Sequence, residues 1–181
     1  MAEAMVGVDP FARSPLADRA RDLAALGAVE VGFLAQVNLR ADPELASARI
    51  AFALPPAPNT WTPTAGREAL WLGPDEWLVV AEPGSAAAIV EELERALEGL
   101  HHSVVDVSAN RAVVELAGGD RMDLLARGCG LDLHPRSWRE GMCAQTLLAR
   151  IPVLLQERDH ATRVFVRASF AHHLVDWLRN A

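Results

Sequence analysis

The sequence predicts an α+β fold in which mainly antiparallel sheets pack against helices. Short apolar runs bounded by turn residues indicate strands, and they alternate with segments whose apolar residues recur at helical spacing. A strand–strand–helix order recurs over residues 70–100, over 104–128 and, with one additional strand, over 143–179. Repetition of this ββα unit is typical of open-faced α+β folds.

The expected helices are marked by capping residues and by apolar periodicity. Ser14 precedes Pro15, which suits a first helical position, and Ser85 and Ser169 are placed to cap later helices. The second helix has apolar residues at helical spacing, namely Ile89, Leu93, Leu97 and Leu100. The expected helices cover residues 14–26, 85–100, 122–127 and 169–179.

The expected strands are short, and two of the connections between them carry clear signals. A hairpin is expected around residues 73–76, because Pro74 supplies the fixed φ that a turn favours. The proline-rich stretch 55–64 is too stiff for a helix and predicts a surface connection. The expected strands cover residues 29–40, 47–54, 70–72, 77–81, 104–107, 112–116, 143–148, 153–157 and 162–166.

Charge and composition exclude several functional classes. The net charge of −7 argues against a sequence-independent hold on nucleic acid. All 17 basic residues are arginine, and the chain contains neither lysine nor tyrosine. These absences exclude a phosphate-loop lysine, a Schiff-base lysine and a tyrosine general acid. Any chemistry would have to come from His, Asp, Glu, Cys, Ser or Thr.

The sequence gives no sign of a membrane segment or of secretion. Its longest apolar runs, such as 151–155, are too short to span a bilayer. Residues 1–10 contain no basic region followed by an apolar one, so we expect no secretory signal. The two cysteines make no disulfide framework and suit a reducing compartment. We therefore expect a cytoplasmic protein.

Two groups of residues could carry chemistry, but each has a simpler structural interpretation. Gly118 and Gly119 lie between a strand and a helix, yet they do not complete a dinucleotide glycine pattern. Asp120 then places a carboxylate where an anion would bind, so we expect a helix cap. The histidine pairs 101–102 and 172–173 place neighbouring rings in different directions, and we expect them at the surface or half-buried.

The stretch 127–138 and the strand after it contain Cys129, His134 and Cys143. A metal site is one interpretation, but the spacings match no compact zinc motif and no fourth ligand is evident. A Cys–His nucleophile pair is another. We favour a third interpretation, a structural corner, because cysteine is readily buried and the apolar residues of the stretch alternate as if docking onto a core.

Five strings occur in order and together resemble the gamma-subunit family of heterotetrameric sarcosine oxidase. The likeness runs from about Ala69 to the end of the chain. We accordingly expect a single domain over 1–181, with a less regular part over 1–65 and the strongest resemblance over 66–181. The strings are LWLGPDEWLVV (70–80), DVSANRAVVELAG (106–118), LLARGCGLDLHPRSW (124–138), CAQTLLARIPVLL (143–155) and SFAHHLVDWL (169–178).

The resemblance implies a role in sarcosine oxidation. The family's enzyme oxidises the N-methyl group of sarcosine with oxygen, yielding glycine and hydrogen peroxide, and passes the one-carbon unit to tetrahydrofolate. The resemblance also implies alpha, beta and delta subunits as partners, with FAD, FMN and NAD on the larger ones. The gamma subunit itself is similar to the folate-binding half of the aminomethyltransferases. We thus expect no catalytic, cofactor-binding or metal-ligating residue in this chain, a stand-alone folate-binding or one-carbon transfer protein being the alternative.

A partner-binding surface is expected over the stretch 136–146. Loops held by a rigid sheet often carry binding residues, and Arg and Trp are among the residue types that most often contribute strongly to the binding energy at interfaces. A solvated loop with a core tryptophan stays the alternative, because tryptophan is mostly buried. The candidate interface residues are Arg136, Trp138, Arg139, Cys143 and Gln145.

Overall fold

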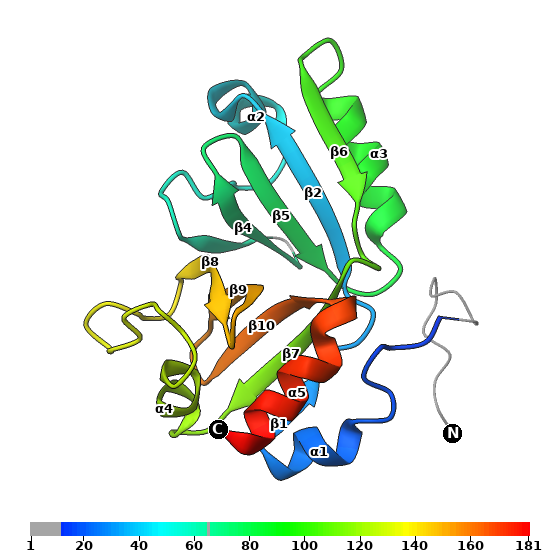
Figure 1. Ribbon diagram of the computed structural model, residues 1–181. Helices are drawn as coiled ribbons and strands as arrows, with labels where there is room; N and C mark the ends of the chain where they lie inside the picture. Colours follow the sequence, from blue (N-terminus) through cyan, green and yellow to red (C-terminus); the bar gives the residue numbers. More distant parts are fainter. Residues whose placement is uncertain (1–11, 65) are drawn as a thin grey trace. The chain divides into compact units, whose positions relative to one another are not determined.

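A computed structural model describes residues 12–64 and 66–181 (Figure 1). The chain divides into two compact units, each with its own antiparallel sheet and apolar core. Residues 33–108 form the first unit, and residues 13–32 with 109–181 form the second. The expectation of a single domain stays a prediction.

The first unit is a five-stranded sheet with strand order β3-β4-β5-β2-β6 within the described residues. Its core gathers apolar side chains from one face of the sheet, and helix α3 packs against β2 and β6. Buried Ile89 and Leu93 of α3 contribute to this core, as the periodicity predicted. The elements are β2 (Ala35–Ala41), α2 (Pro43–Arg49), β3 (Trp61–Thr64), β4 (Arg67–Gly73), β5 (Glu76–Ala81), α3 (Ala86–Ala96) and β6 (His102–Asp106).

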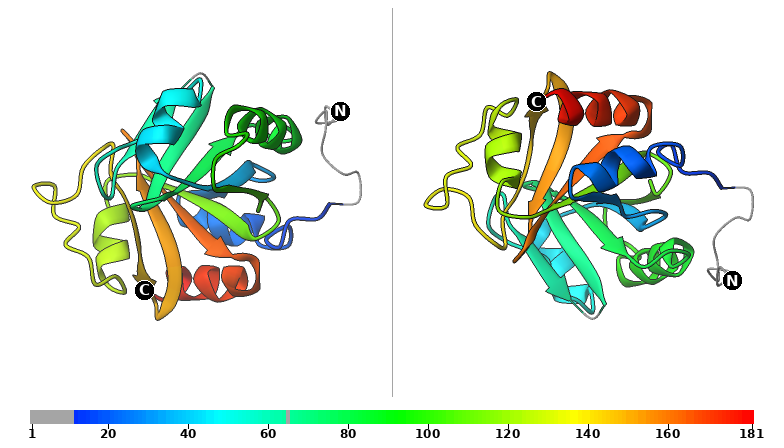
Figure 2. Two further views of the ribbon diagram at one scale, coloured as in Figure 1. Left: turned by 90° about the horizontal axis from the view of Figure 1, so that it is seen from above. Right: turned by 90° about the horizontal axis from the view of Figure 1, so that it is seen from below.

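The second unit is also a five-stranded antiparallel sheet, with order β1-β7-β10-β9-β8 in the described part of the chain. Helix α5 packs against β10, and α1 lies beside α5, as both views of Figure 2 show. The elements are α1 (Ala20–Ala25), β1 (Ala28–Glu30), β7 (Arg111–Ala117), α4 (Arg121–Ala126), β8 (Cys143–Leu148), β9 (Ile151–Glu157), β10 (Ala161–Arg167), the 3₁₀ turn η1 (Ala168–Phe170) and α5 (Ala171–Asn180).

The predicted fold class is confirmed, and so is the predicted hairpin. Strands β4 and β5 pair antiparallel, with Gly73 opposite Glu76 and Pro74 in the connecting turn. One ββα order, made by β4, β5 and α3, runs over residues 67–96. The second expected copy is wrong, because β6 joins the sheet of the first unit while β7 joins that of the second.

Two expected strands, over 47–54 and over 29–40, are corrected by the structure. Residues 47–49, at the start of the expected strand 47–54, belong instead to helix α2. Asp42 caps this helix, because its Oδ1 accepts hydrogen bonds from the backbone N–H groups of Glu44 and Leu45, both at 3.0 Å. The expected strand 29–40 is divided between β1 and β2, which lie in different sheets.

The first and last helices are also shorter than expected. Turns occupy 15–18 and helix α1 begins only at Ala20, so Pro15 lies outside it. Ser169 lies within the 3₁₀ turn, and the N-cap of α5 is Phe170. In both places the sequence provides a serine at the expected cap position, but the chain uses another local turn before the helix starts.

Candidate protein interface

The loop of residues 127–142, which joins α4 to β8, is built on local hydrogen bonds around Asp132. Its Oδ1 accepts from the backbone N–H of His134 at 3.1 Å, and its Oδ2 accepts from Ser137 Oγ at 2.6 Å. The hydrogen bond from Ser137, followed by that from the His134 backbone, lowers the pKa of Asp132. The carbonyl of His134 in turn accepts from the backbone N–H of Trp138 at 2.9 Å. The loop is therefore a folded turn.

A buried carboxylate fixes this loop to the sheet. Glu157 at the end of β9 is only 4% exposed. Its Oε2 accepts from Trp138 Nε1 at 3.0 Å and from Thr162 Oγ1 at 2.5 Å, and its Oε1 accepts from Arg121 Nη2 at 2.7 Å. A buried carboxylate needs such partners, because an unpaired charge in the interior is strongly destabilising. The loop, strands β9 and β10 and helix α4 thus share one polar anchor.

The five candidate interface residues lie in different environments. Trp138 is 5% exposed and Cys143 is fully buried, so neither side chain is presented on the surface of this chain. Arg136, Arg139 and Gln145 are exposed. Within residues 12–64 and 66–181, the guanidinium groups of Arg136 and Arg139 form no hydrogen bond or ion pair. The loop therefore presents two arginines, and Trp138 contributes by fixing their position.

The cysteines and His134 are engaged in the structure of the corner. Cys129 pairs with Leu148 in an isolated β-bridge, and its Sγ lies 3.9 Å from Thr146 Oγ1. His134 Nδ1 accepts from the backbone N–H of Arg136 at 3.2 Å. In the described chain, no three His, Cys, Asp or Glu side chains are grouped as metal ligands. The expectation of a site without metal stays a prediction.

Asp120 and His102, also considered from the sequence, differ in their contacts. Asp120 occupies the N-cap position of α4 as expected, although its side chain makes no capping hydrogen bond. His102 is half-buried, and its ring nitrogens lie 2.9 Å from the carbonyl of Leu100 and 3.0 Å from Glu94 Oε2. The hydrogen bond with Leu100, and then that with Glu94, raises the pKa of His102.

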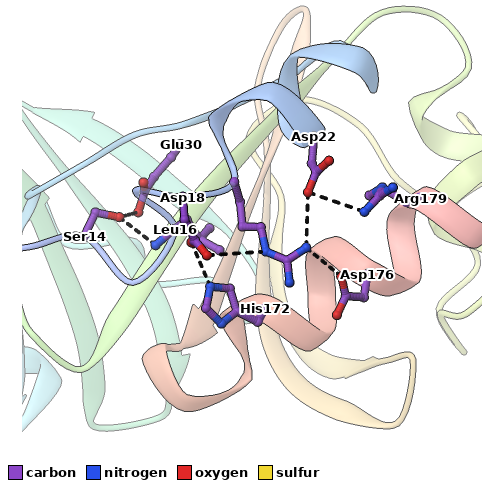
Figure 3. Close-up of polar contacts among 9 residues, drawn as sticks. Ser14, Leu16, Asp18, Asp22, Glu30, His172, Asp176 and Arg179 are labelled. Carbon is purple, nitrogen blue, oxygen red and sulfur yellow. Dashed lines mark hydrogen bonds and ion pairs between the residues drawn. The ribbon is translucent and has the colours of Figure 1, made fainter.

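A second polar cluster ties the N-terminal segment to α5 (Figure 3). Arg19 Nη1 contacts Asp22 Oδ2 at 3.1 Å and Asp176 Oδ1 at 2.9 Å, and Asp18 Oδ1 lies 3.0 Å from His172 Nε2. The hydrogen bond with His172 lowers the pKa of Asp18, and the hydrogen bond with Asp22 raises that of Arg19. Charges of both signs are paired here. This cluster joins α1 to α5.

Sequence reasoning missed the turn between β8 and β9. Ala149 and Arg150 have φ angles of 52° and 67°, in the left-handed region. Leu147, on the adjoining strand, is 56% exposed and lies opposite Pro152. A turn of this kind is normally signalled by Asn-Gly or Asp-Gly, so no local residue pattern pointed to it.

None of the helices in the described residues is long and apolar enough to cross a membrane. The two antiparallel sheets with their helices define an α+β protein, and its fold is similar to part of an aminomethyltransferase. The glycine cleavage system aminomethyltransferase T from Bartonella henselae matches over 88% of this chain and 48% of its own, with a TM-score of 0.65 and 13% identity. At that identity the likeness shows the fold alone.

The sequence comparisons narrow the class to one family. The model of the family described as "Sarcosine oxidase, gamma subunit family" matches residues 39–181. A sarcosine oxidase subunit gamma from Arthrobacter sp. is 39% identical over 182 residues, covering 93% of this chain and 89% of the relative. One from Corynebacterium sp. strain P-1 is 40% identical over 162 residues, covering 84% of this chain and 77% of the relative.

A solved structure agrees with this assignment. A chain of heterotetrameric sarcosine oxidase from Corynebacterium sp. U-96, in complex with pyrrole 2-carboxylate, matches with a TM-score of 0.85 and 35% identity, covering 94% of each chain. The chain belongs to the sarcosine oxidase gamma subunit family. The resemblance seen in the sequence is confirmed.

Proposed function

We propose that this chain is the small non-flavin subunit of a heterotetrameric sarcosine oxidase and that it supports assembly with alpha, beta and delta subunits. The match over 94% of both chains to a chain of the heterotetrameric enzyme carries the proposal. The complex oxidatively demethylates sarcosine to glycine and hydrogen peroxide, with the one-carbon unit passing to tetrahydrofolate. The chain acts by binding its partners, and it works in the cytoplasm, where its two cysteines, neither of them in a disulfide, stay reduced.

We place FAD, FMN and NAD on the larger subunits. The sequence has no G-x-G-x-x-G stretch to bring backbone N–H groups to a pyrophosphate, and it has no lysine. The buried carboxylate of Glu157 in the second unit is used in a structural pair with Arg121 at 2.7 Å. These features support a chain that positions other subunits.

The docking contact includes the exposed residues of the candidate stretch: Arg136, Arg139 and Gln145. Planar guanidinium groups bind carboxylates in two-point contacts, and they are energetically important at interfaces. The Trp138–Glu157 hydrogen bond holds the loop before a partner arrives. Less conformational freedom is therefore lost on binding.

The test is co-expression with the other three subunits, followed by size-exclusion chromatography and a sarcosine-dependent peroxide assay. We expect the double variant Arg136→Ala, Arg139→Ala to weaken assembly while the melting temperature of the isolated chain stays nearly unchanged. Arg21→Ala, which removes an exposed arginine from α1, is the matched control. Normal assembly of the double variant, or its unfolding, would exclude this loop as the interface.

The alternative function is a stand-alone folate-binding or one-carbon transfer protein. The isolated chain separates the two proposals: we expect it to be colourless, to produce no peroxide from sarcosine with added flavin, and to contain no stoichiometric zinc. Tight binding of tetrahydrofolate by the isolated chain in calorimetry, without any assembly with the larger subunits, would favour the alternative.

A further inference from the structure

The turn between β8 and β9 adopts a geometry that its residues disfavour. Leu148 pairs with Ile151, so only Ala149 and Arg150 connect the strands. Their φ angles of 52° and 67° place both in the left-handed region, as a type I′ turn requires. Glycine and asparagine adopt this region readily, whereas Ala and Arg are strained there. Strained backbone is often retained where a side chain has a function.

The surrounding structure holds the turn in place. The backbone N–H of Ala149 donates to the carbonyl of Gly128 at 3.0 Å. Gly128 is itself packed so tightly that a Cβ there would lie 2.4 Å from Trp177 Cζ2. The backbone of the turn is therefore held against Gly128, which in turn packs against Trp177 of α5.

The surface beside Arg150 combines a free cation with exposed apolar groups. In the alternation of β8, Gln145 and Leu147 share one face, and Leu147 lies opposite Pro152. Leu147 is 56% exposed, and Gln145, Arg150 and Pro152 are exposed as well. We define the hairpin tip as Gln145, Leu147, Arg150 and Pro152.

The segment 127–150, which ends at the β8–β9 turn, differs in net charge from the chain as a whole. Residues 127–150 contain four arginines and two carboxylates, a net charge of +2, in a chain whose net charge is −7. Within the described residues, Arg150 forms no hydrogen bond or ion pair. By contrast, four other arginines of the second unit are paired with carboxylates: Arg19, Arg121, Arg163 and Arg179.

We propose that the hairpin tip docks on an acidic surface of another subunit of the oxidase. A carboxylate of the partner accepts hydrogen bonds from the guanidinium of Arg150, and an apolar side chain covers Leu147 and Pro152. This inference rests on the proposed function and adds the chemistry of the partner. Charge complementarity selects an acidic occupant, and the cost of the strained turn is offset by an arginine fixed for a two-point contact.

The decisive variant is Arg150→Gly, because it relieves strain and removes the guanidinium together. We expect the melting temperature of the isolated chain to rise by about 2–4 °C. Assembly with the other three subunits should weaken on the order of tenfold, which is the effect of losing one good charged contact. Ala149→Asn is the matched control: it relieves strain but retains Arg150, so the melting temperature should rise while assembly is unchanged.

Arg150→Glu tests the sign of the partner's charge. It leaves a strained turn but should weaken assembly more than Arg150→Gly does, and assembly of the wild type should weaken as salt is raised. If both Arg150 variants assemble as well as the wild-type chain does, the hairpin-tip proposal is overturned but the proposed function is not. Failure of the wild-type chain to join the complex would instead overturn the proposed function. A dimer of the isolated chain that Arg150→Glu abolishes would show that a second copy occupies the tip and would also overturn the proposal.

Discussion

The indole of Trp138 and the carboxylate of Glu157 meet at 3.0 Å, although 19 residues separate them in the sequence. Trp138 lies in the loop after α4, and Glu157 ends β9. This one contact makes the loop part of the second unit's folded body, so that Arg136 and Arg139 are displayed from a fixed base. The stability of that base is open to direct measurement.

Replacing Glu157 by Gln should strongly destabilise the chain. The variant keeps the size of the side chain but leaves the guanidinium of Arg121, now paired at 2.7 Å, without its charge partner. We expect the free energy of unfolding in urea to fall by about 2–4 kcal/mol.

Arg95→Gln is the control for this variant, because it breaks an exposed i,i+4 pair with Glu91. Its effect should stay within about 0.5 kcal/mol. An equally small effect of Glu157→Gln would show that the buried anchor contributes little.

Two glycines of the same loop region should respond oppositely to alanine. A Cβ at Gly128 would lie 2.4 Å from Trp177 Cζ2, whereas a Cβ at Gly130 would meet nothing within 4 Å. We expect Gly128→Ala to lower the free energy of unfolding by about 1–3 kcal/mol through overpacking. Gly130→Ala should be close to neutral. Equal effects in thermal unfolding would contradict the close approach of Gly128 to Trp177 of α5.

Stability should depend on pH through His102. Its pKa is raised above the ordinary 6.5 by the hydrogen bonds with the Leu100 carbonyl and with Glu94, so the folded state holds this proton more tightly than the unfolded state. The contribution is fully present below pH 6.5 and is lost as pH rises through the folded pKa. Wild type minus His102→Gln should therefore show a stability difference that shrinks on raising the pH from about 6 to about 8. His101→Gln, at an exposed neighbour, should leave that profile unchanged.

The cluster in Figure 3 should control how firmly α1 is held. Arg19→Ala removes the contacts with Asp22 and Asp176, whereas Arg21→Ala changes an exposed arginine of the same helix. Hydrogen exchange at the amide of buried Leu23 should become several-fold faster in the first variant only, and added salt should reduce the difference. The same exchange rate in both variants would mean that apolar packing alone holds α1.

The features that could be predicted from the sequence are those with short-range causes. Pro74 beside two apolar runs predicted the β4–β5 hairpin, because a turn and its flanking strands are set by adjacent residues. The periodicity of α3 predicted which of its side chains are buried. The order of five sequence strings was enough to indicate the family, which the comparisons then confirmed.

The rest depended on contacts between residues far apart in the chain. The residues of β6 and β7 do not by themselves determine which sheet each strand joins, because either strand could pair with any strand edge of matching register. The segment 47–54 was wrongly predicted as a strand. Its apolar residues suit a strand, but the helix that begins after the cap at Asp42 extends to Arg49. Composition and local pattern thus determine the α+β class and most elements. Long-range pairing and burial determine the anchor at Glu157 and the strained turn at Arg150. Both depend on residues that meet only after the sheets have formed. They therefore also determine which surface a partner can reach.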